Sequence, residues 1–142
     1  MKKIALLLLV LFSACHGLLN PVSFEGPFFL NFGESKILTP DNLRVEFNQI
    51  IEESRCPGDV LCPWEGRARI GLLLQSAGDT VQVELTLPGF ATQSDTLAHQ
   101  PVDTIGYRIT LLQLDPYPDT QRPPQRDSDY RALLNISRLV RR

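Results

Sequence analysis

The chain has 142 residues, of which 14 are Lys or Arg and 16 are Asp or Glu, so its formal net charge is −2. This acidic balance argues against nucleic acid or anionic lipid as the main partner. The length suffices for one domain with one hydrophobic core.

The first 14 residues are expected to be an export signal that is not part of the fold. Lys2 and Lys3 precede nine apolar residues, Ile4–Phe12, and the small residues Ser13 and Ala14 follow. This order is that of a bacterial signal peptide. Nine residues rise only about 14 Å as a helix, roughly half a bilayer core. Without Lys2 and Lys3 the net charge becomes −4, and because no later apolar run is long enough to span a membrane, we expect the exported part to be soluble.

The segment Leu11–Cys15, which reads Leu-Phe-Ser-Ala-Cys, resembles the lipobox of bacterial lipoproteins, with Phe12 where Leu is usual. The resemblance implies that Cys15 becomes the N-terminus and carries acyl chains such as palmitate. The alternative is an ordinary signal peptide that is cleaved nearby. Each buried CH₂ contributes about 0.8 kcal/mol, so several acyl chains would anchor the protein to the outer membrane or to the periplasmic face of the inner membrane. Residues 15–25 would form the tether and residues 26–142 the domain.

Apolar and polar residues alternate in five stretches of the remaining chain, and this period of two predicts strands with one buried face. The five stretches are Leu43–Asn48, Ala68–Gln75, Thr80–Leu87, Tyr107–Leu111 and Tyr130–Ser137. Phe28–Leu30 and Ser35–Leu38 are expected to be two shorter strands, and a helical turn is an alternative only for Asn48–Glu53. The pattern predicts an all-β fold, a small antiparallel β-sandwich of about seven strands. An immunoglobulin-like order is one option, and a closed barrel is the alternative.

Turn-forming residues separate these stretches. Ser76–Asp79, with Gly78 inside it, is expected to join two strands as a hairpin. Pro88–Ile105 and Asp115–Asp129 lack periodicity and are predicted to be long loops. The second loop holds four prolines, which do not fit the middle of a sheet, and Tyr117 is expected to hold it against the domain.

The three cysteines are an odd number, which requires an explanation in an exported protein. If Cys15 carries lipid, Cys56 and Cys62 are left to form a disulfide in an oxidising compartment. A zinc site is not expected, because five residues separate this pair and the only histidines are His16 and His99. The spacing also differs from the Cys-x-x-Cys of thiol oxidoreductases. We therefore predict a structural disulfide, with no metal and no cofactor.

Catalytic motifs are not found, so the chain is not expected to be an enzyme. Gly-x-Ser-x-Gly, His-Glu-x-x-His and a phosphate-binding glycine loop do not occur. His99 could pair with Ser94 or Asp95, but all three belong to one loop, and His99 is predicted to be a surface residue. Glu52 and Glu53 are predicted to be a solvated pair at the end of a strand.

Trp64, the only tryptophan, has two interpretations. In the favoured one it packs on the Cys56–Cys62 bridge and closes one end of the sandwich, since small domains need the burial energy of a Trp. Gly66 supports this interpretation, because a Gly lets the chain turn tightly after a bulky anchor. In the alternative, the loop presents Trp64, Glu65 and Arg67 as a binding site for a protein or a glycan.

The run Ser54–Pro57, followed by Val60, Cys62, Trp64 and Gly66, resembles a motif of a family of small exported bacterial proteins that are often lipoproteins. The family motif reads Asp-Ser-Arg-Cys-Pro-x-x-Val-x-Cys-x-Trp-x-Gly, and this chain has Glu53 in place of the Asp. The segments Phe28–Ser35 and Pro116–Pro118 are also similar to that family. The resemblance covers most of the predicted domain, and it implies no activity.

These observations together predict a lipid-anchored protein of the bacterial cell envelope with a non-catalytic role in binding or envelope maintenance. Its partners would be the membrane, through Cys15, and a protein or glycan. The alternative is an inhibitor of secreted proteases that acts through the Cys56–Cys62 loop and Asp115–Asp129 at one end of the sandwich.

Overall fold

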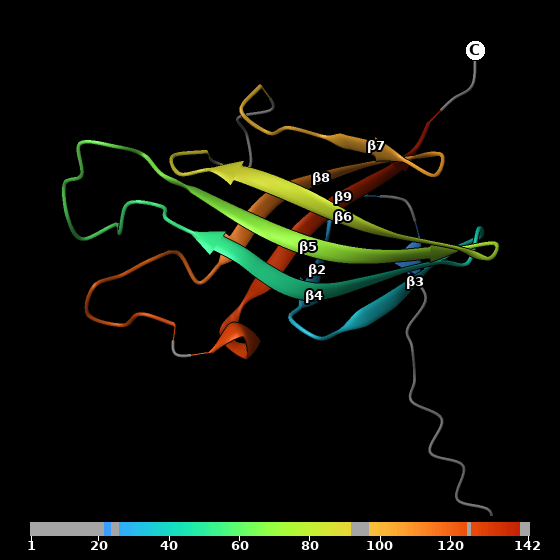
Figure 1. Ribbon diagram of the computed structural model, residues 1–142, viewed down its shortest axis with the longest axis horizontal. Helices are drawn as coiled ribbons and strands as arrows, with labels where there is room; N and C mark the ends of the chain where they lie inside the picture. Colours follow the sequence, from blue (N-terminus) through green and yellow to red (C-terminus); the bar gives the residue numbers. More distant parts are fainter. Residues whose placement is uncertain (1–21, 24–25, 92–96, 125, 140–142) are drawn as a thin grey trace, which may run out of the picture.

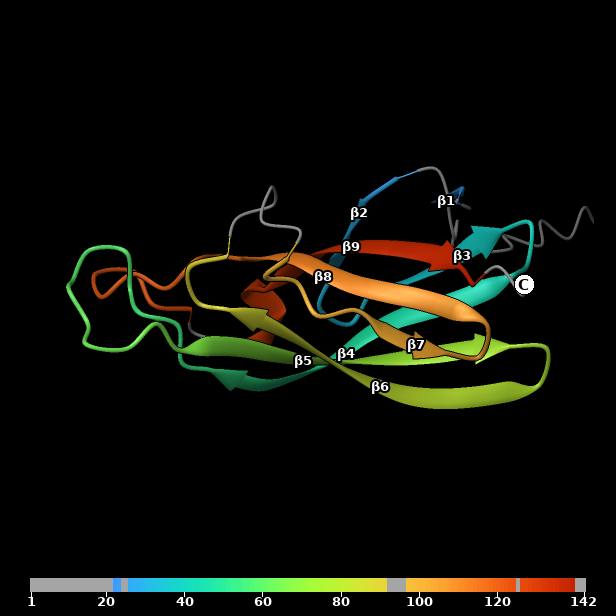
Figure 2. The same ribbon diagram turned by 90° about the horizontal axis from the view of Figure 1, so that it is seen from above.

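The computed structural model describes residues 22–23, 26–91, 97–124 and 126–139, and these residues form two β-sheets packed face to face (Figures 1 and 2). The predicted all-β sandwich is therefore confirmed. The predicted signal peptide and the lipidation site Cys15 lie outside the described residues. No helix in the described part of the chain is long and apolar enough to span a membrane.

One sheet has the strand order β1-β3-β4-β5-β6, in which β1 pairs with β3 in parallel and the other pairs are antiparallel. Its strands are β1 (Val22–Ser23), β3 (Ser35–Thr39), β4 (Leu43–Glu53), β5 (Arg67–Ser76) and β6 (Asp79–Pro88). Four consecutive strands, β3 to β6, thus share one sheet. The immunoglobulin order, in which the chain changes sheet between its second and third strands, is different.

The other sheet is antiparallel and has the order β2-β9-β8-β7. Its strands are β2 (Phe28–Asn31), β7 (Val102–Thr104), β8 (Tyr107–Asp115) and β9 (Arg131–Arg138). A single 3₁₀ turn, η1 (Asp127–Asp129), precedes β9. β8 and β9 run diagonally across β4, β5 and β6 in Figure 1, and Figure 2 shows them as a separate layer.

The core lies between the two sheets and consists mainly of the apolar members of the alternating stretches, to which Phe28, Leu30, Leu38 and Leu114 are added. Its largest fully buried side chains include Phe47, Leu72, Leu85, Leu111 and Leu134. Burying each such side chain contributes about 1.5–3 kcal/mol, so this layer is the main source of stability.

Two irregularities in the pairing of β4 with β5 decide which β4 residues face the core. The register shifts between Phe47 and Gln49 and again between Ile50 and Glu52. Directly paired residues point to the same face of a sheet. Ile50 pairs with Ile70 and Glu53 pairs with Ala68, and both β5 partners are fully buried. The last residue of β4 is therefore a carboxylate on the core face.

All seven predicted strands are present, and two short strands were missed. The predicted loop Pro88–Ile105 contains β7, and the predicted tether contains β1. Asn48–Glu53 is strand and not a helical turn. The hairpin between β5 and β6 is confirmed, and Ala77 and Gly78 both have positive φ angles, 48° and 95°, as a two-residue turn of this kind requires.

Candidate binding surface

Three connections meet at one end of the sandwich, which we call the loop end. They are the Cys loop (Arg55–Gly66), the start of the β6–β7 connection (Gly89–Ala91) and the proline loop (Pro116–Pro124). Figure 1 shows them at the left as green, yellow and orange segments. Five large apolar or aromatic side chains are exposed in these segments, namely Val60, Leu61, Trp64, Phe90 and Tyr117.

A disulfide between Cys56 and Cys62 closes the Cys loop, as predicted. The two Cα atoms are 5.9 Å apart, and Cys56 is buried. Val60 and Leu61 lie within the ring, and Trp64 follows it. Exposure is greatest at Leu61, whose relative accessibility is 103%. The disulfide thus fixes a short segment that directs apolar side chains into solvent.

Arg55 connects the Cys loop to the opposite sheet. Its side chain is only 2% exposed. The Nη1 group donates a hydrogen bond of 3.0 Å to the carbonyl of Leu114 in β8, and Nη2 donates to the carbonyl of Pro116. The Tyr117 ring covers the guanidinium at 4.8 Å from its centroid. This arrangement combines charged hydrogen bonds with a cation–π contact in a desolvated place.

Glu53 neutralises the buried Arg55. Its two carboxylate oxygens accept hydrogen bonds from Nε and Nη2 of Arg55 at 2.8 and 2.5 Å, and the Glu53 side chain is 16% exposed. A buried charge is tolerated only when it is paired and hydrogen-bonded. The prediction that Glu53 is solvated was therefore wrong, because β4 ends with this residue on the core face.

Glu52, the neighbour of Glu53, points to the other face of the sheet. It accepts hydrogen bonds from Ser54, from Arg67 at 3.0 Å and from Arg69 at 3.4 Å. The hydrogen bonds from Ser54 and then from Arg67 hold the pKa of Glu52 below its usual value. Glu52 and Glu53 thus belong to different clusters and do not form the predicted solvated pair.

The proline loop is fastened to the other two segments, and Tyr117 fastens it, as expected. The Tyr117 hydroxyl donates a hydrogen bond of 2.8 Å to the carbonyl of Gly89. Gly58 donates to the carbonyl of Pro118, and both the backbone N–H and the hydroxyl of Thr120 donate to Asp59. The hydrogen bonds from Thr120 lower the pKa of Asp59. The three segments therefore form one connected structure.

Two glycines allow the backbones of this end to approach each other. Gly66 has φ +68°, and a Cβ atom there would lie 1.8 Å from the carbonyl oxygen of Ser54. A Cβ atom at Gly89 would lie 1.9 Å from the carbonyl oxygen of Glu65. Both contacts are with backbone, so no side chain could be accommodated. Phe90 is thereby placed next to the base of the Cys loop.

The favoured interpretation of Trp64 was wrong, because its relative accessibility is 63%. Arg55, Glu53 and Tyr117 already fill the end of the sandwich where Trp64 was expected to pack. Glu65 is exposed beside it, and its carbonyl accepts the N–H of Cys56. Arg67 begins β5 and pairs with Glu52 at 3.0 Å. Of the three predicted binding residues, Trp64 and Glu65 thus lie at the loop end, whereas Arg67 joins the outer face of the sheet.

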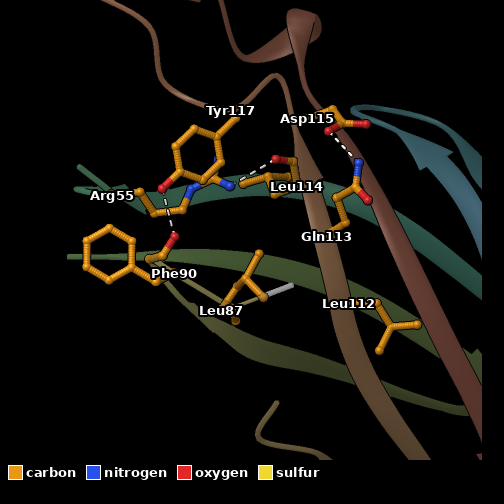
Figure 3. A pocket seen from close by; sticks show the side chains of 10 residues that line it. Arg55, Leu87, Phe90, Leu112, Gln113, Leu114, Asp115 and Tyr117 are labelled. Carbon is orange, nitrogen blue, oxygen red and sulfur yellow. Dashed lines mark hydrogen bonds between the residues drawn. The ribbon is translucent and has the colours of Figure 1, made fainter. Parts of the chain in front are cut away.

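A pocket of about 640 Å³ opens between the ends of β6 and β8 (Figure 3). Its lining residues are Arg55, Leu87, Gly89, Phe90, Ala91, Leu112, Gln113, Leu114, Asp115 and Tyr117. Arg55, Tyr117 and Phe90 lie along one side of it, and Leu112 lies on the opposite side. The polar groups already bond to one another or to backbone, as in the hydrogen bond from Gln113 to Asp115. The pocket therefore suits an apolar side chain.

His99 is buried, with 5% relative accessibility, and the prediction of a surface residue was wrong. It lies in the segment that leads to β7 and lines a small pocket with Arg108, Thr110 and Asn135. Its proposed partners Ser94 and Asp95 lie outside the described residues. Among the residues that the structure describes, no group of three or more His, Cys, Asp or Glu side chains is placed to hold a metal ion.

Sequence reasoning missed Arg55 and Phe90. The signal for Arg55 was the order Glu53-x-Arg55-Cys56, an acid and a base two positions apart beside a buried half-cystine. No sequence pattern indicated that Phe90 would be exposed at this end of the sandwich.

Comparison of the chain with known proteins finds no matching family model, no similar curated protein and no similar solved structure.

Proposed function

We propose that this chain is a lipid-anchored protein of the bacterial cell envelope with a non-catalytic role in binding or envelope maintenance, and that the loop end is its binding surface. The proposal includes lipidation at Cys15 and membership of the exported family whose motif the Cys loop resembles. The partner is a protein or a glycan.

The exposure of Trp64 is the observation that carries this proposal. Trp and Tyr are enriched at the energetic centres of interfaces, where they bury a large area at a small entropic cost. Trp64 lies outside the described core cluster, and Arg55 and Glu53 already close this end of the sandwich. A large apolar side chain that is fixed in solvent by a disulfide-closed loop is better explained by a partner than by stability.

The position of the loop end relative to the anchor supports the same role. β1 pairs with Leu38 and Thr39, next to the residue where β4 begins, whereas the Cys loop follows the last residue of β4. A strand of 11 residues spans about 35 Å. A tether that enters at β1 would therefore leave the loop end free to face away from the anchoring membrane.

The test compares the wild type with Trp64→Ala and, as a matched control, Phe29→Ala, which removes an exposed aromatic side chain from β2. Each detergent-extracted protein is used to recover partners from the native envelope, and its melting temperature is measured in parallel. We expect Trp64→Ala to lose a partner without losing stability, and Phe29→Ala to retain it. Equal recovery by all three proteins would contradict the proposal.

Inhibition of secreted proteases is the second candidate. It is favoured by the contact between the two predicted loops, which Gly58, Asp59, Pro118 and Thr120 join. A rigid, doubly fastened loop with Leu61 fully exposed is a shape that can occupy an active-site cleft. An inhibitor would lower the activity of one member of a protease panel at equimolar concentration, and Leu61→Asp would abolish that effect.

A further inference from the structure

The outer edge of β6 differs from every other sheet edge in the described residues. The other three edge strands are short, with two residues in β1, four in β2 and three in β7. β6 has ten residues, and within the described part of the chain its only hydrogen-bonded neighbour is β5. Short edge strands are one device by which proteins avoid unwanted pairing. β6 lacks this device.

The hairpin turn determines which backbone groups of β6 point outward. In a two-residue hairpin the residues that flank the turn, here Ser76 and Asp79, form a hydrogen-bonded pair, and such pairs then alternate with non-bonded ones. The same alternation predicts that Gly66 and Gly89 form a bonded pair, and the N–H of Gly89 does donate to the carbonyl of Gly66. The residues between the bonded pairs direct their N–H and C=O groups away from β5. These residues are Thr80, Gln82, Glu84 and Thr86.

Two other protective features are not found along β6 in the described residues. The pairing of β5 with β6 runs from Arg67–Pro88 to Ser76–Asp79 without a shift, so no bulge twists the edge away. Pro88 occupies the next position at which a backbone N–H would point outward. Because proline has no N–H, the series of outward N–H donors along β6 ends at Thr86. The charged residues of β6 are Asp79 and Glu84, both acidic, and β6 itself contains no Lys or Arg. Glu84 is paired with Arg69 of β5, whereas Asp79 lies beside the hairpin turn. A segment that carries a basic residue opposite Asp79 would complement this edge.

The row of outward groups leads directly to the pocket between β6 and β8. Thr86 is the last outward residue, and Leu87, Gly89, Phe90 and Ala91 line the pocket. An extended segment that pairs with β6 would continue past Thr86 into this region. Its side chains alternate between the two faces, so the ones on the core side would reach the apolar pocket.

A second copy of this chain is a poorer occupant than a different protein. Two copies could pair their β6 strands antiparallel with Val83 at the centre. In this register residues with outward N–H and C=O groups would face each other, with Gln82 opposite Glu84 of the other copy. Leu87 would then lie opposite Asp79, the first β6 residue of the other copy, so Phe90 would extend beyond the end of the paired strand. Such a dimer would leave both the pocket and Phe90, which is 62% exposed, uncovered.

We propose that an extended, basic segment of a partner protein adds to β6 as a further strand and places an apolar side chain in the pocket between β6 and β8. This mode of recognition takes affinity from backbone hydrogen bonds and specificity from the pocket. The inference rests on the proposed binding role and names the surface and the partner class.

The probe is a display library of random peptides of about ten residues, the length of a long strand. The full-length protein selects peptides from it, and their affinities are then measured with purified full-length variants. Thr86→Pro removes an outward N–H but no hydrogen bond to β5, whereas Thr86→Ala keeps the N–H and only shortens the side chain. Ala91→Trp fills the pocket. Hydrogen exchange on the unmodified protein adds a readout that does not depend on the folding of any variant.

We expect selected peptides to alternate apolar and polar residues and to include Lys or Arg. Thr86→Pro should weaken binding by about tenfold or more, since it removes a backbone donor, and Thr86→Ala by less than about twofold. Ala91→Trp should abolish binding. Bound peptide should slow amide exchange at Gln82, Glu84 and Thr86.

Several results would overturn the inference. They are a failure to enrich any peptide, equal affinities for Thr86→Pro and Thr86→Ala, unchanged exchange along β6, and a dimer of the protein that Thr86→Pro dissociates. Loss of binding in Trp64→Ala but not in Thr86→Pro would refute strand addition and leave the loop end as the binding surface. Loss of binding in Thr86→Pro but not in Trp64→Ala would support strand addition and refute the proposed role of Trp64 in binding.

Discussion

The guanidinium of Arg55 lies 4.8 Å from the ring centroid of Tyr117, and this contact joins the β4–β5 connection to the β8–β9 connection (Figure 3). Because Arg55 also bonds to Glu53 and to the carbonyl of Leu114, one buried side chain links both sheets at the loop end. Because Arg55 closes this end, Trp64 does not have the packing role that the sequence suggested.

Replacing Arg55 by Met should destabilise the domain strongly. The change leaves Glu53 without its partner on the core face and removes the cover of Tyr117. Breaking a buried ion pair costs about 3–5 kcal/mol, which corresponds to a fall in melting temperature of more than about 10 °C. Thermal unfolding followed by circular dichroism measures this effect.

The double variant Arg55→Met with Glu53→Met is the control, because it removes both charges. It should recover part of the loss, since apolar residues of similar volume can replace a buried pair at little cost. If Arg55→Met alone melted like the wild type, Arg55 would not be the link between the sheets.

The disulfide should be present in the exported protein and should stabilise it moderately. Non-reducing mass spectrometry is expected to find Cys56 and Cys62 two hydrogens short. Closing so small a ring contributes about 2 kcal/mol through the entropy of the unfolded chain, so the Cys56→Ser, Cys62→Ser variant should melt several degrees lower. Two free thiols in the mature protein would refute this prediction.

Acid should weaken the attachment of β9 to the β3–β4 turn. Arg138 donates two hydrogen bonds of 2.6 Å to Asp41, and Tyr107 donates a third. The hydrogen bonds from Arg138, ahead of that from Tyr107, hold the pKa of Asp41 below its ordinary value of 3.8. A lowered pKa means that the unfolded chain takes up the proton first. The stabilising effect is therefore complete above about pH 4 and is lost as the pH falls through the folded-state pKa.

Melting temperatures between neutral pH and about pH 3 test this, because this range crosses the ordinary pKa of 3.8. Asp41→Asn should melt below the wild type at neutral pH, and the difference should shrink in acid. Arg138→Gln should show the same convergence, since it removes the other partner. A difference that stays constant over this range would show that Asp41 is not responsible.

Cys15→Ser should release the protein from the membrane, because the proposed acyl chains would have no attachment site. Fractionation of cells that express the wild type and the variant measures the effect, with the variant expected in the aqueous fraction. Ala14→Gly, which keeps a small residue before Cys15, is the matched control and should remain membrane-bound. If Cys15→Ser still required detergent for extraction, lipidation at this position would be excluded.

Much of the fold followed from the period-two alternation, because most residues that face the core of a small sandwich are apolar. The alternation failed where the backbone departs from regular pairing. The shifts around Gln49 and Glu52 interrupt the pattern of β4 and made Asn48–Glu53 ambiguous. β7 was missed because three residues are too few to show a period.

The candidate site was harder to predict because burial at the loop end depends on contacts between distant segments. Trp64 is the larger hydrophobic residue and was expected inside, yet Arg55 occupies that place. The reason is that Glu53 and two backbone carbonyls 59 and 61 residues away satisfy its charge and its donors. His99 belongs to a segment that was predicted to be a loop, and its burial beside β8 likewise involves residues distant in sequence from the β6–β7 connection, such as Asn135.

Photo-cross-linking from the Cys loop tests the central proposal most directly. A photoreactive amino acid is placed at Leu61, which is fully exposed, or at Gln75, an exposed residue near the opposite end of β5. The full-length protein is then irradiated in intact cells. We predict a discrete protein or glycan adduct from position 61 that Trp64→Ala removes, and none from position 75. Equal labelling from both positions, or none from position 61, would contradict the assignment of the loop end as the binding surface.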